Sequence, residues 1–452
     1  MAAEESKERL ADRLTDLVGE PVDGLTLLTG GASRTTWAFD TPTRQLILRL
    51  DPPAAQLKQM EREARCLRAA GAAGVPVPTV VAASDDSSVI GSSFMILERI
   101  GGETIPRRIL RDPEFGPCRA NLLGQSAEAL VAIHAVDPAS VEGLDSSDQL
   151  DSWAARLHAL PTTLPALEVA LLWLEGHRPE ARKNVFVHGD FRLGNLMVGP
   201  EGLRAVLDWE LAHAGDPVED LGWMCVRAWR FSSSLPALGL GSYEQLCEAY
   251  EAAGGLPADP GALSWWELFG TWRWGIICAG MAEVSRASGN LSVELAAIGR
   301  RTCENEWDVL ACLERSGVEI ADVDAAADLT APATPQCAAA GLHGVPAASE
   351  IVAAVRAFLE ESVRPSLEGS VAFHARIAGR VLAMVERELA LGAVQGAAHS
   401  VLLARLGLSS EAEMASAVRS GRLAHDDPVL LGTIRWSAAA RLEVAHPGYR
   451  EG

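Results

Sequence analysis

The stretch that decides the fold is residues 187–223, VHGDFRLGNLMVGPEGLRAVLDWELAHAGDPVEDLGW. Short hydrophobic segments such as LMV and AVL predict strands in this stretch. Asp190, Asn195 and Asp208 stand at the ends of these segments. Strand ends and the loops after them are where proteins commonly place reactive side chains. The stretch therefore predicts a functional site on a small framework of strands.

The spacing of the polar residues indicates one kind of chemistry. Asn195 lies five residues after Asp190, and Asp208 follows thirteen residues later. Carboxamide and carboxylate oxygens bind hard divalent cations, so Asn195 and Asp208 can hold Mg²⁺ while Asp190 accepts or orients a substrate hydroxyl. Phosphoryl transfer depends mainly on such placement and on charge neutralisation. One such residue alone is more often a turn former, but the full set matches the spacing of a kinase catalytic loop.

Three motifs in this stretch carry a family resemblance. HGDFRLGN, LDWE and GDPVEDL resemble the aminoglycoside phosphotransferase and choline kinase family, over roughly residues 20–310. The resemblance implies an α+β, two-lobed protein-kinase-like fold and an enzyme, a small-molecule kinase that uses ATP and Mg²⁺. It also implies that His188 and Asp220 brace the catalytic loop by hydrogen bonds.

Arg192 follows the predicted catalytic carboxylate by two residues and has two interpretations. At this position it could contact the transferring phosphate or the substrate. It could equally pair with a neighbouring carboxylate.

The resemblance implies a nucleotide site in the N-terminal lobe. The GGASR turn, with Gly31 and Ser33, is a candidate phosphate-covering turn, although it also fits an ordinary hairpin. The family usually places Lys on the following strand, and here that strand ends in Arg49. Arginine keeps the positive charge and can bind phosphate with two hydrogen bonds, so we take it as the replacement, with Glu63 as its partner.

Two further regions are expected to bind small molecules. Residues from Glu98 to Ile100 would form the hinge whose backbone meets adenine. Trp266 and Arg273 lie in an aromatic-rich helix and are candidates for the acceptor pocket. Aromatic residues at helical spacing are more often part of a core, so that alternative stays open.

The remaining pattern predicts four segments. Residues 1–100 form the N-lobe, with an N-terminal helix, an antiparallel sheet and one helix, and residues 101–317 form a mostly helical C-lobe. Residues 318–348 are rich in Ala, Asp, Pro and Thr and predict a linker. Residues 349–452 predict a small all-α domain, in which Ile377, Val381, Val385 and Leu389 mark the buried stripe of a helix.

The composition of the chain limits the kinds of partner that we expect. The net charge of −21 disfavours binding to nucleic acid. No apolar run in the sequence reaches the ~18 residues that a membrane-spanning helix needs. The N-terminal residues lack the apolar stretch of a signal peptide, so we expect a cytoplasmic protein. The eight cysteines show no metal-binding spacing and are expected to be reduced and mostly buried.

Three hypotheses for the function remain open, and the first two differ in the acceptor of the phosphoryl group. The sequence looks most similar to the subgroup related to the kinase-like domain of some acyl-CoA dehydrogenases, which implies a hydroxyacyl-CoA or related metabolite. The acidic composition leaves an aminoglycoside as the first alternative. Arg49 and the weak glycine-rich turn leave a catalytically silent binding or scaffold protein as the second. The C-terminal region resembles a helical domain of unknown function found beside such phosphotransferases, and it could serve a homodimer or a partner enzyme.

Overall fold

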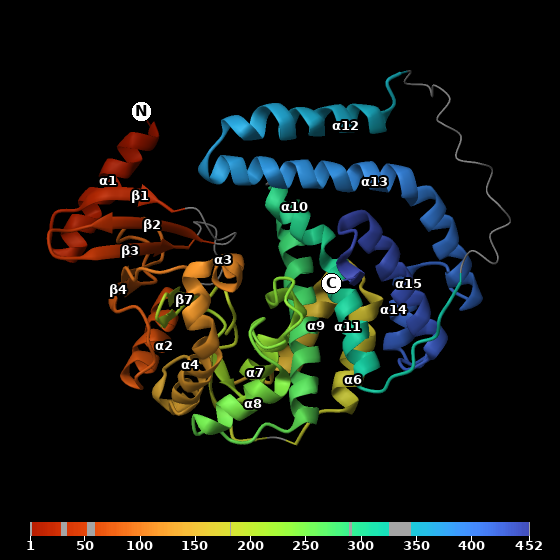
Figure 1. The fold of residues 1–452 in the computed structure, drawn as a ribbon, viewed down its shortest axis with the longest axis horizontal. Coiled ribbons are helices and arrows are strands. Elements are labelled where there is room, and N and C mark those ends of the chain that lie inside the picture. The colour runs from red at the N-terminus through yellow and green to blue at the C-terminus, as the bar shows by residue number, and fades with distance from the viewer. Residues whose placement is uncertain are drawn as a thin grey trace. The chain divides into compact units, whose positions relative to one another are not determined.

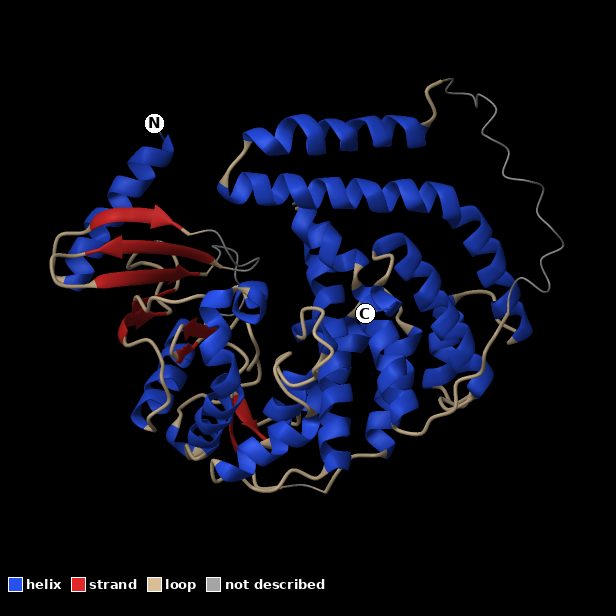
Figure 2. Ribbon diagram, in the orientation of Figure 1, coloured by secondary structure: helices blue, strands red, loops and turns tan. Residues whose placement is uncertain are grey.

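The computed structural model describes residues 2–28, 34–51, 59–180, 182–288, 292–324 and 345–451. The chain divides into two compact units. Unit 1 contains residues 1–148 and 179–267, and unit 2 contains residues 149–178 and 268–452. Strands lie in unit 1, whereas the elements of unit 2 in the described part of the chain are helices (Figure 2).

Unit 1 begins with a helix and a five-stranded sheet, as the sequence predicts (Figure 1). The sheet order is β1-β2-β3-β5-β4, and every neighbouring pair is antiparallel. Alternating apolar residues such as Leu46 and Leu48 bury one face against α1 in a cluster with Leu14 and Phe39. The elements are α1 Ala2–Val18, β1 Asp23–Leu27, β2 Thr35–Asp40, β3 Gln45–Leu50, α2 Met60–Ala72, β4 Val80–Ser84 and β5 Phe94–Glu98.

In the rest of unit 1 the predicted catalytic loop, residues 188–195, joins two small antiparallel sheets of two strands each. One sheet pairs β6 with β9, and the other pairs β7 with β8. Helices surround these strands, and each begins where a polar or proline residue permits it, as at the Ser242 capping box of α8. The elements are α3 Pro106–Arg111, α4 Gly116–His134, β6 Val185–Val187, β7 Leu196–Gly199, β8 Gly202–Val206, β9 His213–Gly215, α7 Val218–Cys225 and α8 Tyr243–Ala252.

The regular elements of unit 2 are helices in the part of the chain that the structure describes. Helix α9 crosses the division: its residues up to Glu267 belong to unit 1 and those from Leu268 belong to unit 2. The elements are α5 Gln149–Ala159, α6 Pro165–Gly176, α9 Pro260–Ser288, α10 Val293–Arg300, α11 Thr302–Arg315, α12 Ala348–Phe358, α13 Gly369–Arg405, α14 Glu411–Arg419 and α15 Pro428–Ala445.

These compact units cut across the predicted segments. The N-lobe and the catalytic loop share one hydrophobic cluster, which includes Leu67, Leu97 and Phe191, and so belong to a single unit. The C-terminal helices share a unit with α6 and α11, and Arg419 of α14 hydrogen-bonds Glu168 of α6. The first residues of the predicted linker are also bonded within unit 2, because the Ala321 N–H donates to the Pro428 carbonyl. Residues 325–344 of that linker lie outside the described residues.

The predicted helical stripe of the C-terminal domain is partly wrong. Ile377, Val381 and Val385 are half-buried, but Leu389 is 52% exposed. Helix α13 runs to Arg405, and its later turns bury Ala398 and Leu402 instead. A long helix drifts relative to a strict seven-residue repeat, so its buried face changes along its length.

Two general expectations can be compared with the structure. Within the described residues, no helix is both long and apolar enough to cross a bilayer. The seven described cysteines are free thiols, and six of them are buried. This confirms the prediction that the thiols are mostly buried, with Cys247 as the exception among the described cysteines.

Candidate active site

The catalytic loop depends on two left-handed backbone positions. Gly189 has φ of 79°, and a Cβ there would lie 2.5 Å from the Leu211 carbonyl oxygen. Glycine is therefore required between His188 and Asp190. Asp208 has φ of 64°, a conformation that Asp tolerates better than most residues. Each residue turns the chain sharply at the end of a strand and so aims its neighbouring side chains.

Asp190 is buried and held by three side-chain donors. Arg192 Nε donates to Oδ1 at 2.9 Å, and Trp223 Nε1 donates to the same oxygen at 2.8 Å. Asn195 Nδ2 donates to Oδ2 and also to the Asp190 carbonyl oxygen. A carboxylate offers about four acceptor positions, so one remains on Oδ2. The arrangement fixes the orientation of the carboxylate and leaves it able to accept one more hydrogen bond.

His188 and Asp220 brace this loop, as the resemblance implies. The Asp220 carboxylate accepts the backbone N–H groups of His188 and Gly189, both at 2.9 Å. His188 Nδ1 accepts the Asp190 N–H, and Nε2 lies 3.0 Å from the Leu207 carbonyl oxygen. These partners require the neutral tautomer with its proton on Nε2. Burial lowers the pKa of His188 against the opposing effect of Asp220, so neutrality is favoured.

A second network of charges lies beside the loop. Arg49 on β3 pairs with Glu63 of α2 at 2.6 Å and with Asp208 at 2.8 Å. Arg34 pairs with the other oxygen of Glu63 at 2.6 Å and with Asp51 at 2.9 Å. The predicted Arg49–Glu63 pair is therefore present, and it is one part of a larger network.

This network sets the charge of the predicted metal-binding carboxylate. Burial opposes ionisation of Asp208, but the charge and hydrogen bond of Arg49 outweigh it and hold the pKa of Asp208 below its usual value. Glu210, two residues on, responds in the opposite direction. Burial and the negative charge of Asp208 raise the pKa of Glu210 to about 7. The two neighbouring carboxylates therefore differ in protonation near neutral pH.

Asn195 and Asp208 face a cavity of about 660 Å³ in unit 1. Arg49, Glu98 and Ile100 line the same cavity, together with Gly101 and Gly102. The volume is within the 300–1,000 Å³ typical of small-molecule sites. Predicted nucleotide-binding and metal-binding residues thus meet in one place. Gly31 and Ser33, the predicted phosphate-covering turn, lie outside the described residues.

The oxygen donors in this cavity fit Mg²⁺. Asn195 commits its amide nitrogen to Asp190, which leaves Oδ1 for a cation, and Asp208 supplies a carboxylate. The described residues contain no group of three or more His, Cys, Asp or Glu side chains that could hold a metal ion. Magnesium commonly uses only one or two protein oxygens together with water and substrate phosphates, so this small donor set suits it.

The remaining predicted site residues are Arg192, Arg273 and Trp266, and each is paired with or packed against other residues. Arg192 pairs with Asp190, and its guanidinium stacks 4.3 Å from the ring centre of Trp229. Arg273 is 1% exposed in unit 2, where its guanidinium lies 5.6 Å from the Phe269 ring. Trp266 belongs to unit 1 and packs on Gly222 of α7. These positions match the core alternative for the aromatic helix better than an acceptor pocket.

Sequence reasoning missed two contacts of the loop. Trp223 stands three residues after Asp220 on α7, on the same helical face, so its spacing was a usable signal. His134 Nε2 lies 3.1 Å from Asp220, and its Nδ1 lies 2.6 Å from the Tyr250 hydroxyl. No local pattern connects His134 with a carboxylate 86 residues away.

The fold and site together define a kinase-like phosphotransferase. A model of the phosphotransferase enzyme family (APH) matches residues 24–266. The chain therefore belongs to this family. Residues 365–449 match a domain of unknown function, DUF6285.

Particular relatives are similar over part of their length. Acyl-CoA dehydrogenase family member 10 of Mus musculus is 37% identical over 226 residues, which is 46% of this chain and 20% of that protein. Acyl-CoA dehydrogenase family member 11 of Homo sapiens is 29% identical over 233 residues, which is 48% of this chain and 29% of that protein. The chain thus spans less than a third of the length of these relatives.

A solved structure is similar over most of its own length. It is a protein of Ralstonia eutropha provisionally classed as an aminoglycoside phosphotransferase, with 25% sequence identity and a TM-score of 0.54. The match covers 68% of this chain and 98% of that protein. It agrees with the two-lobed kinase-like fold expected from the sequence.

Proposed function

We propose that this protein is an ATP- and Mg²⁺-dependent kinase that phosphorylates a hydroxyl group of a small metabolite. The observation that carries the proposal is the arrangement of Asp190, Asn195 and Asp208. Asn195 bonds Asp190 and also lines the cavity that contains Asp208 and Arg49. The Asn195 amide thus connects two parts of the site. One is the Asp190 carboxylate, which suits a substrate hydroxyl, and the other is the cavity with Asp208 and Arg49, which suits a metal ion and phosphate.

The protein groups divide the work of phosphoryl transfer. Asp190 holds the acceptor hydroxyl through its remaining acceptor position and receives the proton as the oxygen attacks. Trp223 and Arg192 fix the orientation of that carboxylate. Arg49 places a permanent positive charge in the nucleotide cavity, and Glu63 holds it there. Mg²⁺, held by Asn195 and Asp208, would neutralise charge on the nucleotide phosphates.

For the acceptor we propose a hydroxylated acyl compound, such as a hydroxyacyl-CoA. The support is similarity to proteins whose names refer to acyl-CoA, at 37% identity for one of them. The second candidate is an aminoglycoside, which the likeness to the Ralstonia eutropha protein favours. Both candidates use the same chemistry, so only the acceptor distinguishes them.

The test is ATP-dependent mass gain on a panel of hydroxyacyl-CoAs, other hydroxylated metabolites and aminoglycosides. We expect a gain of one phosphoryl group on a hydroxyacyl compound, and Asp190→Asn to reduce the rate by about 100- to 10,000-fold. Asp12→Asn changes an exposed carboxylate of α1 in the same way and is the matched control. Phosphorylation of aminoglycosides alone would replace the acyl proposal. An unchanged rate in Asp190→Asn would overturn the catalytic assignment, and the absence of turnover would support a silent binding protein.

A further inference from the structure

A pocket of about 380 Å³ in unit 1 is distinct from the cavity that contains Asp208. Its walls come from the end of α3, from α4 and from the loop 231–240 that precedes α8. The charged side chains of its lining are Arg111 and Arg119, and the described lining residues include no carboxylate. The pocket thus carries positive charge that its own lining does not neutralise.

Both arginines have donors that a ligand can reach. Within the described residues, neither Arg111 nor Arg119 forms an ion pair. Arg111 is exposed, and its Nη2 donates to the Phe231 carbonyl oxygen at 3.4 Å. Arg119 uses Nη1 for the carbonyl oxygens of Ile109 and Asp112, both at 2.9 Å. Its Nε and Nη2 keep no acceptor in the described part of the chain, and neither atom is buried.

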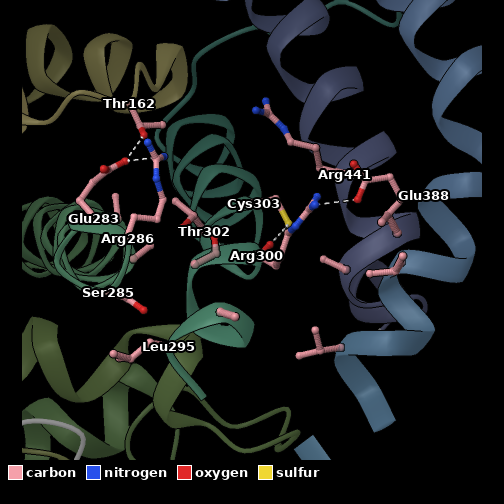
Figure 3. A pocket seen from close by; sticks show the side chains of 18 of the residues that line it. Thr162, Glu283, Ser285, Arg286, Leu295, Arg300, Thr302, Cys303, Glu388 and Arg441 are labelled. Carbon is pink, nitrogen blue, oxygen red and sulfur yellow. Dashed lines mark hydrogen bonds and ion pairs between the residues drawn. The ribbon is translucent and has the colours of Figure 1, made fainter. Parts of the chain in front are cut away.

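A larger cavity in unit 2, of about 850 Å³, shows the opposite arrangement (Figure 3). Helices α11, α13 and α15 contribute to its lining. Its arginines are paired with glutamates, for example Arg300 with Glu388 at 2.6 Å and Arg286 with Glu283 at 3.0 Å, as the dashed lines show. A chain with a net charge of −21 has many carboxylates to offer its arginines. Two guanidinium groups without one in a single pocket therefore favour an anionic ligand.

The loop 231–240 has a strained backbone. Among the described residues, four that are not glycine have a positive φ. One is Asp208 in the candidate active site, and the other three lie in this loop: Phe231, Ser232 and Leu238, with φ of 49°, 68° and 54°. Such conformations are unfavourable for bulky side chains and are found most often at functional sites. Their distribution here supports a binding role for the loop.

Two sides of the pocket are connected to the catalytic loop. Helix α3 begins at Pro106, whose Cγ would lie 3.9 Å from a Cβ at Gly194 of that loop, and it ends at Arg111. A helix of this length spans about 9 Å. On the other side Trp229, just before the loop 231–240, stacks on the Arg192 guanidinium. The pocket therefore lies about one short helix away from the catalytic loop.

We propose that Arg111 and Arg119 bind a phosphate group of the phosphotransfer acceptor. Guanidinium groups bind phosphate through paired, charge-assisted hydrogen bonds, and a pocket without carboxylates disfavours a cationic aminoglycoside. A hydroxyacyl-CoA carries its phosphates far along a flexible chain from the acyl hydroxyl, so one molecule can reach from this pocket to Asp190. That the ligand is the acceptor rests on the proposed function.

The test measures binding to the full-length protein by calorimetry, with saturating ADP and Mg²⁺ present to fill the nucleotide cavity. Coenzyme A and pantetheine share the thiol-bearing arm, but only coenzyme A has phosphates. We expect coenzyme A to bind at least about tenfold more tightly than pantetheine. Equal binding of the two would overturn the phosphate assignment. Inorganic phosphate is the third probe, and binding as tight as that of coenzyme A would show a site for free phosphate and overturn the acceptor assignment.

Two variants locate the bound phosphate. We expect Arg111→Gln and Arg119→Gln each to weaken coenzyme A binding at least about tenfold, because each removes donors from the pocket. Arg107→Gln changes an exposed arginine of the same helix outside the lining and should leave the affinity unchanged. Arg119 also holds two backbone carbonyls, so the exposed Arg111 decides the outcome if Arg119→Gln does not fold. Unchanged affinity in Arg111→Gln would contradict the proposal.

The same variants separate this inference from the proposed function. Phosphorylation of a hydroxyacyl-CoA with the same KM for the acceptor in Arg111→Gln and the unmodified protein would overturn the inference and leave the proposed function standing. Binding of coenzyme A that depends on Arg111, without phosphorylation of any acceptor, would overturn the proposed function and leave the phosphate site standing.

Discussion

Asp220 in unit 1 and Glu306 in unit 2 are both almost completely buried carboxylates, at 0% and 1% exposure. Asp220 accepts two backbone N–H groups and lies 3.1 Å from His134, and its pKa is lowered although burial opposes this. Glu306 has an unbonded oxygen, and burial raises its pKa against the weaker effect of Arg441. Both carboxylates are buried, yet the pKa of Asp220 is lowered and that of Glu306 is raised. The number of hydrogen-bond donors directed at each carboxylate decides the direction of the shift.

The largest expected effect comes from removing the Asp220 carboxylate, which has the fuller set of hydrogen bonds. Asp220→Ala leaves the N–H groups of His188 and Gly189 buried without an acceptor. We expect a loss of about 3–5 kcal/mol in the free energy of unfolding, as for other broken buried charge networks. Urea unfolding measures it. Asp220→Asn keeps one acceptor oxygen and should lose less. Equal losses in both variants would mean that the negative charge, which both variants remove, matters more than the individual hydrogen bonds.

A smaller effect is expected from one donor to the catalytic carboxylate. Trp223→Phe removes the N–H that donates to Asp190. A hydrogen bond to a charged group contributes about 1.5–3 kcal/mol, so kcat for phosphotransfer should fall roughly 10- to 150-fold with KM for ATP little changed. Trp272→Phe is the control, because it also removes a buried indole bond, to the Leu167 carbonyl in unit 2. A similar fall in kcat for Trp272→Phe would show a general loss of stability instead.

The opposite sign is expected for the poorly bonded carboxylate. Glu306→Met replaces a buried group that has an unsatisfied oxygen with an apolar one, while Arg441 keeps its pair with Glu411. We expect the free energy of unfolding to increase by about 1 kcal/mol in the absence of ligand. Thermal and urea unfolding measure the change. A loss of several kcal/mol would mean that Glu306 is held by its ion pair with Arg441 and would remove the contrast with Asp220.

The smallest expected effect is a change in pH dependence. The pKa of His188 is lower in the folded protein than in the unfolded chain, so the unfolded chain takes up the proton first as the pH falls. The stability from neutral His188 is complete above about pH 6.5 and is lost below it. His188→Gln preserves one donor and one acceptor but does not titrate, so it should flatten this acid loss.

Glu306 predicts the reverse slope. Its folded pKa is raised, so stability falls as the pH rises above the unfolded pKa of about 4.3. Unfolding curves at several pH values between 4 and 8 should therefore separate the two residues. An unchanged acid slope in His188→Gln would contradict the assigned tautomer and its hydrogen bonds.

Much of the candidate site was predictable because it is local in sequence. Asp190, Asn195 and Asp208 lie beside one run of short strands, and their spacing matches that of a kinase catalytic loop. The Arg49–Glu63 pair was also predictable, since the family pattern supplied both positions. The Trp223 bond was within reach for the same reason. What could not be predicted were the contacts made over long sequence separation, such as His134 with Asp220.

The class of the fold could be predicted from the sequence, but its division into compact units was less predictable. Alternating and helical hydrophobic patterns located β2, β3 and α2 and the all-α character of the C-terminus. Periodicity reports which face of an element is buried, but it does not report which element buries it. For that reason the joining of α6 and α11 with the C-terminal helices had no signal in the sequence. The cavity lined by α11, α13 and α15 had none either.

The arginine on β3 also affects the chemical durability of the site. A lysine amine is nucleophilic and can be acylated by thioesters, whereas a guanidinium stays protonated and does not react in this way. The whole chain has only three lysines, Lys7, Lys58 and Lys183, and none lies on β3. With the proposed acyl thioester as acceptor, Arg49 would be a phosphate-binding cation that the substrate cannot modify.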